Sequence, residues 1–165
     1  MKYLLLGLGL GLLSTAIYAN EKSICGETDD RALSLESEVG RSSNSIGLIG
    51  CTATLISDNC AISAGHCVGV LTKVSFNVPE SVDKIPQSSD PRDVYELDKP
   101  TLVWADNGEG DDWAVFKLKE NSITNKLPGV VQGHLDVELS NSRIKGQTIR
   151  ITGFGSDKAD PIRNF

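Results

Sequence analysis

The sequence predicts an all-β domain, built as an antiparallel barrel or sandwich. Short runs rich in Val, Ile, Thr and aromatic residues recur along the chain, and Gly, Pro, Asn and Asp separate them. No long stretch with helical periodicity follows the N-terminal apolar segment. Such short runs between turn residues are typical of strands in antiparallel sheets.

The first element, residues 1–19, has the pattern of a secretory signal peptide. Lys2 precedes the apolar run Tyr3–Leu13, and small residues lead to Ala19 before a polar stretch that begins at Asn20. A transmembrane anchor is the alternative, but the uninterrupted apolar run is shorter than the roughly 20 residues that a spanning helix needs. We therefore expect cleavage before Asn20, no membrane association afterwards, and a secreted or periplasmic protein.

The exported part, residues 20–165, is long enough for one domain with a substantial core. Two segments, Pro79–Asp93 and Asn121–Ser142, are polar or interrupted by Pro and Gly, so we expect surface loops there, the second leading to another structural unit. Trp104 and Trp113 occupy strand positions and are expected in the core. The expected strands, in order, are Ser45–Ile49, Thr52–Ser57, Cys60–Ser63, Lys73–Val78, Val94–Leu97, Thr101–Trp104, Trp113–Leu118 and Thr148–Gly153.

The charge of the chain limits its partners. The formal net charge is −6, and no stretch of the sequence gathers Lys and Arg residues. Nucleic acids and anionic lipids are bound mainly through clustered cations, so neither is expected as a partner. We expect a monomer.

The four cysteines, Cys25, Cys51, Cys60 and Cys67, all lie in the exported part. An even number in an oxidising compartment predicts two disulfides, and four cysteines allow three pairings. A zinc site would need ligands spaced as C-x2-C or H-x3-H, and neither spacing occurs. We therefore expect no metal and no cofactor.

Several motifs resemble the trypsin-like (chymotrypsin-fold, peptidase S1) serine proteases. CTATLISDNCAISAGHC, residues 51–67, resembles the family's histidine segment, and DWAVFKL, residues 112–118, resembles its aspartate motif at about the right interval. SICGETDDR and IGLIGCTATLIS are more similar to the bacterial branch that includes glutamyl endopeptidases. IRITGFGSD resembles a glycine-bearing strand near the start of the family's second barrel.

This resemblance covers roughly Ile24–Phe165, the N-terminal part of the family's domain. It implies a Greek-key barrel over residues 44–120, approximately, and the opening strands of a second barrel over about 143–165. It also implies that Cys51 pairs with Cys67, which leaves Cys25 with Cys60.

The resemblance further implies two catalytic residues. His66 would be the acid-base residue, and Asp112 the buried carboxylate that orients it, because a serine hydroxyl becomes a good nucleophile only when a positioned imidazole takes its proton. Asp111 is the alternative orienting residue, but Asp112 directly precedes the apolar strand, so Asp111 is expected in a solvated loop. Ala64 and Gly65 are expected to leave space for substrate beside the imidazole. His134 matches no motif and is expected in an exposed loop.

The family's nucleophile segment, Gly-Asp-Ser-Gly-Gly, does not occur in the 165 residues. Ser156, in GFGSD, is the nearest imitation, but by resemblance it belongs to an early strand of the second barrel. Two functions follow. The chain is the front part of a secreted serine endopeptidase acting on polypeptides, inactive without its nucleophile, or it is a non-catalytic pseudoprotease or binding module. The ending ADPIRNF favours the first, because a barrel that stops midway exposes unpaired strand edges.

Overall fold

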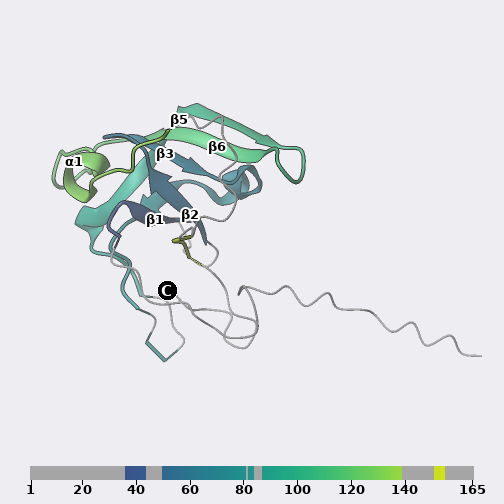
Figure 1. The fold of residues 1–165 in the computed structure, drawn as a ribbon. Coiled ribbons are helices and arrows are strands. Elements are labelled where there is room, and N and C mark those ends of the chain that lie inside the picture. Colours follow the sequence, from purple (N-terminus) through teal and green to yellow (C-terminus); the bar gives the residue numbers. More distant parts are fainter. Residues whose placement is uncertain (1–35, 44–49, 81, 84–86, 139–150, 155–165) are drawn as a thin grey trace, which may run out of the picture.

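The computed structural model of the protein describes residues 36–43, 50–80, 82–83, 87–138 and 151–154. Six antiparallel strands close into a barrel in the order β1-β2-β3-β6-β5-β4 (Figure 1). The fourth strand of the chain therefore lies beside the first, and the third beside the sixth, which confirms the predicted all-β Greek-key barrel. The strands are β1 Val39–Ser43, β2 Gly50–Leu55, β3 Cys60–Ser63, β4 Lys73–Ser75, β5 Val94–Asp106 and β6 Asp112–Leu118.

Apolar side chains that alternate along the strands fill the barrel. In β6, Ala114, Phe116 and Leu118 are at most 1% exposed, as expected for residues that share one face of a strand. The rings of Phe76 and Tyr95 meet edge to face with their centroids 5.7 Å apart. The remaining core residues are Ala53, Leu55, Ala61, Leu71, Val74 and Leu97.

Strand β5 joins two of the expected strands, Val94–Leu97 and Thr101–Trp104, into one. Its register against β6 shifts between Asp98 and Val103, and Pro100 lies inside this interval. Proline has no N–H to donate to a ladder, so pairing is interrupted at that position while the strand continues beyond it.

Strand β1 was not expected, because its sequence, VGRSS, lacks an apolar alternation. It pairs with both β2 and β4 and so closes the barrel, which begins ahead of the expected boundary at residue 44. The expected strand Ser45–Ile49 lies outside the described residues. Partners on both sides stabilise β1 where its own composition does not.

Two further expected strands are shortened or missing. Strand β4 ends at Ser75, and Asn77 has a φ of +47°, which a continuing strand does not adopt. Of the expected strand Thr148–Gly153, residues 151–153 are described and are not a strand, and 148–150 lie outside the described residues. The backbone N–H of Phe154 donates to Thr52 Oγ1 at 2.8 Å, so this segment lies against β2.

A short helix, α1 (Pro128–Gln132), interrupts the segment that was expected to be a loop. The N–H of Gly129 donates to the carbonyl of Asp58 at 2.7 Å, and Gln132 Nε2 donates to Asp93 Oδ1 at 2.7 Å. These bonds fasten the segment after β6 onto the barrel. Across the described ranges, no helix has the length and apolar character needed to cross a bilayer.

Candidate active site

The β5–β6 hairpin positions Asp112. Its turn is closed by two backbone hydrogen bonds, from Asn107 N–H to Asp111 O at 2.9 Å and from Asp111 N–H to Gly108 O at 3.0 Å. Gly108 and Gly110 have positive φ values of 97° and 86°, which glycine adopts without strain. The chain leaves this turn and enters β6 at Asp112.

The neighbouring Asp111 serves the turn instead of the imidazole. Its carboxylate accepts hydrogen bonds from Asn107 Nδ2 at 2.7 Å and from Trp113 Nε1 at 2.9 Å. Asp111 was expected to be merely solvated, whereas both of its side-chain oxygens organise the hairpin. Sequence reasoning missed this role, although the run NGEGD, residues 107–111, has the Asn, Gly and Asp residues that are typical of turns.

His66 is presented by a 3₁₀ turn, Gly65–Val70, that follows β3. Gly65 begins this turn in direct contact with the hairpin: a Cβ there would overlap the carbonyl oxygen of Ala105 and lie 3.0 Å from the carbonyl oxygen of Trp113. The sequence prediction was that Gly65 leaves room for substrate. The structure instead fills that room with hairpin backbone, so the glycine is needed to seat the histidine turn on β5 and β6.

His66 and Asp112 meet through two hydrogen bonds. The backbone N–H of His66 donates to Asp112 Oδ1 at 3.0 Å, and His66 Nδ1 lies 2.7 Å from Asp112 Oδ2. The side-chain hydrogen bond and then the backbone bond hold the pKa of Asp112 below its ordinary value. An ionised carboxylate can only accept a hydrogen bond, so Nδ1 carries a proton and its N–H donates the hydrogen bond to Asp112 Oδ2.

The pair is open to solvent in the described part of the chain. The side chain of His66 is 61% exposed and that of Asp112 is 30% exposed. Among the described residues, no serine hydroxyl and no other side chain makes a hydrogen bond with His66 Nε2. This nitrogen is therefore accessible to a group that approaches from outside.

A disulfide joins Cys51 of β2 to Cys67, the residue after the histidine, with 6.2 Å between their Cα atoms. It ties the histidine turn to the barrel wall. Sulfur atoms of these cysteines and a ring nitrogen of His66 lie within 4.8 Å of one another. The two sulfurs are bonded to each other, however, and metal ligation needs free thiolates, so this group is not a metal site in its oxidised form. Cys60 has no disulfide partner among the described residues, and its expected partner Cys25 lies outside them.

The structure also describes the two tryptophans and the second histidine that were singled out in the sequence. Trp104 and Trp113 were expected in the core but are 51% and 42% exposed. They pair with Ala114 and Ala105, near the turn of the hairpin, which extends past β1–β3 (Figure 1). His134 follows α1, and its Nε2 lies 4.0 Å from Asp58 Oδ1. Ser156 lies outside the described residues.

Most of the chain resembles a known protein family. A protein-family model described as Trypsin matches residues 30–163, which include the barrel, His66 and Asp112. No curated protein matches the chain.

Proposed function

Since the chain belongs to the trypsin family, we propose that it supplies the histidine and the aspartate of a serine endopeptidase that hydrolyses polypeptides by acyl transfer. The observation that carries the proposal is the contact between His66 and Asp112, with Nδ1 2.7 Å from Oδ2. A carboxylate on one imidazole nitrogen leaves the other with a lone pair, which a general base requires.

Each residue has a stated role in this chemistry. His66 Nε2 takes the proton of a serine hydroxyl as the oxygen attacks the substrate carbonyl, and later returns it to the leaving amine. Asp112 holds the imidazole in the tautomer with a proton on Nδ1 and stabilises the imidazolium. The second bond from Asp112, to the backbone N–H of His66, fixes the orientation of the turn as well as that of the ring.

The nucleophile is the component that these 165 residues do not supply. No Gly-Asp-Ser-Gly-Gly or Gly-x-Ser-x-Gly occurs in them, so neither the activated serine nor the oxyanion amides of such a segment can be assigned. We propose that the 165-residue chain is inactive by itself. This same observation favours the second candidate function, a non-catalytic binding module that keeps the histidine barrel.

We further propose where the protein is located and to which branch of the family it belongs. The signal-peptide pattern predicted for residues 1–19 and the Cys51–Cys67 disulfide support a secreted or periplasmic location, because disulfides persist in oxidising compartments. A place in the glutamyl-endopeptidase branch, pairing of Cys25 with Cys60, and a monomeric state are proposals that rest on the sequence alone.

A serine-reactive fluorophosphonate probe and a casein substrate test the function. The 165-residue chain should stay unlabelled and leave casein intact. A product that continues past Phe165 into a Gly-Asp-Ser-Gly-Gly segment should react with the probe and cleave casein. In that product His66→Ala should lower turnover by on the order of 10⁶, and Asp112→Asn by about 10⁴.

His134→Ala is the matched control, because His134 lies on the segment after α1 and should leave turnover unchanged. A longer product that carries the serine segment but is indifferent to His66→Ala would rule out the protease mechanism. A product that never reacts with the probe would favour the binding module. Labelling of the short chain would show that its nucleophile had been misplaced.

A further inference from the structure

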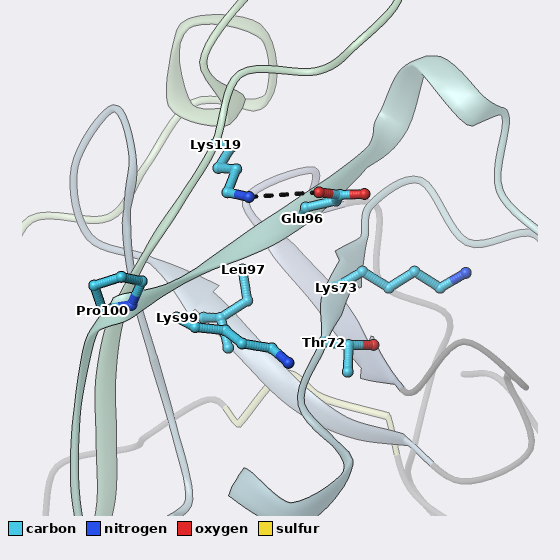
Figure 2. Close-up of a pocket in the computed structure, with 7 residues that line it drawn as sticks. All are labelled: Thr72, Lys73, Glu96, Leu97, Lys99, Pro100 and Lys119. Atoms are coloured by element: carbon cyan, nitrogen blue, oxygen red, sulfur yellow. Dashed lines mark ion pairs between the residues drawn. The ribbon is translucent and has the colours of Figure 1, made fainter.

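A basic pocket lies on the outside of the barrel, where β4, β5 and the segment after β6 meet (Figure 2). Its volume is about 510 Å³, within the range of about 300–1,000 Å³ that is usual for ligand sites. Lys73, Lys99 and Lys119 line it together with one acidic residue, Glu96, while Thr72, Leu97 and Pro100 supply the rest of its wall.

Backbone hydrogen bonds hold the wall of this pocket in place. Leu97 N–H donates to the carbonyl of Thr72 at 2.9 Å, and Lys119 N–H donates to the carbonyl of Glu96 at 2.9 Å. Lys73 and Glu96 are partners across the β4–β5 ladder. The backbone of three segments that are distant in sequence is thereby fixed around one hollow, while the exposed lysine side chains at its rim can adjust to a ligand.

The charge of the pocket is opposite to that of the protein. Among the described residues that line it, three are lysines and one is a glutamate, in a chain whose formal net charge is −6. Glu96 Oε2 lies 3.7 Å from Lys119 Nζ, but the two side chains are 77% and 54% exposed, so this ion pair is weak. Within the described part of the chain, neither Lys73 nor Lys99 forms an ion pair. The described residues thus leave both ammonium groups available to an anion.

We propose that this pocket binds an acidic segment of a polypeptide. The cations among the described lining residues are lysines, which act as point charges on flexible stems, and none of these residues is an arginine, whose fork can bind a phosphate in two places. Pro100, which is exposed, adds apolar surface, and this suits a peptide that carries an apolar side chain between carboxylates; Leu97 is buried in the barrel core and contributes only to the floor of the pocket. A nucleic acid carries a charge on every nucleotide and is bound mainly through extended clusters of cations, whereas a short acidic segment needs only the few lysines that line this pocket, which favours the peptide.

The pocket is separate from the pair formed by His66 and Asp112. Asp112 begins β6 and Lys119 follows its other end, and β6 has 7 residues. At roughly 3.3 Å per residue the strand spans about 20 Å. A peptide in the pocket therefore leaves the histidine uncovered, and a long polypeptide could contact both places. Only the choice of a polypeptide as ligand rests on the proposed function.

Binding of a fluorescent peptide, Glu-Leu-Glu-Glu-Leu-Glu, to the full chain at low salt tests the inference through anisotropy. The same peptide with glutamine in place of each glutamate should bind far less. Lys73→Gln and Lys99→Gln should each weaken binding about two- to fivefold, as expected for exposed charge pairs. Glu96→Gln should strengthen binding by a similar factor, because it removes a carboxylate that lies beside the lysines.

Lys117→Gln is the matched control, since this lysine lies exposed on β6 and does not line the pocket. If Lys117→Gln weakens binding as much as the pocket variants do, only the overall charge of the protein matters. If the Lys73→Gln, Lys99→Gln double variant binds the peptide unchanged, the pocket is not the binding site. Either outcome overturns the proposal. Inorganic phosphate or an oligothymidylate that binds more tightly than the peptide, with the same dependence on Lys99, would overturn the choice of ligand. None of these measurements involves hydrolysis, so they are independent of the protease proposal.

Discussion

Substitution of Gly65 by alanine should disrupt the contact between His66 and Asp112 without touching either residue. The added Cβ would overlap the carbonyl oxygen of Ala105 and lie 2.7 Å from its carbonyl carbon, and both atoms belong to hairpin backbone. A flexible side chain could move aside, but paired backbone cannot do so cheaply. Overpacking of this kind costs about 1–3 kcal/mol in the free energy of unfolding.

The histidine turn would have to move to relieve this overlap, and the movement should change the contact between His66 and Asp112. A displacement of the turn on the order of 1 Å would lengthen the 2.7 Å distance between His66 Nδ1 and Asp112 Oδ2 beyond hydrogen-bonding range. Urea unfolding would measure the lost stability, and the NMR resonance of the Nδ1 proton, which needs its hydrogen bond to be protected from exchange, would report the lost contact.

Gly69→Ala provides the matched control, because Gly69 lies in the same 3₁₀ turn and a Cβ there would meet nothing within 4 Å. That variant should keep the Nδ1 resonance and gain about 0.4–1 kcal/mol, as glycine-to-alanine changes do where the backbone permits them. If Gly65→Ala unfolds at the same urea concentration as the parent and keeps the resonance, glycine is not what seats the turn on the hairpin.

Three further measurements test the surroundings of the site. Asp111→Ala should lower the free energy of unfolding by about 1 kcal/mol and shift tryptophan fluorescence, because the Trp113 indole loses its acceptor. Asp111→Asn should have smaller effects on both quantities, and equal effects of the two variants would contradict a role in the turn. Joint replacement of Cys51 and Cys67 by alanine should cost about 3 kcal/mol in urea unfolding, since the bridge closes a separation of 16 residues, and a loss below 1 kcal/mol would count against that reasoning. The pKa of Asp90 is lowered to about 2 by the side-chain and backbone hydrogen bonds of Arg92, so its contribution to stability should be complete above its ordinary pKa and disappear as the pH falls through 2. Arg92→Ala should return its NMR titration midpoint towards about 3.9, and an unmoved midpoint would refute this cause.

The strands could be predicted where local composition and tertiary pairing agree. Cys60–Ser63 and most of β6 were located from β-branched and alternating apolar residues. Strand β1 could not be found in this way, because VGRSS becomes a strand only through its partners on both sides. The continuity of β5 was hidden for a related reason: Pro100 looks like a strand end, while the ladders on either side carry the strand past it.

Less of the candidate site than of the fold could be predicted from the sequence. Asp111 and Asp112 are adjacent and chemically identical, yet Asp111 still belongs to the turn, while Asp112 is the first residue of β6 and shares the strand face of the buried Ala114. The motif therefore identifies which carboxylate turns towards the barrel and the histidine. It cannot show why glycine precedes His66, because the atoms that exclude a side chain there come from Ala105, far along the chain. The basic pocket could not be predicted from the sequence for the same reason. The β4–β5 ladder and the hydrogen bond from Lys119 N–H to Glu96 O bring together lysines that lie far apart in the sequence. Side-chain chemistry can thus be read from a motif, whereas close approaches of backbone and charges gathered from separate strands become visible only once the ladders are formed.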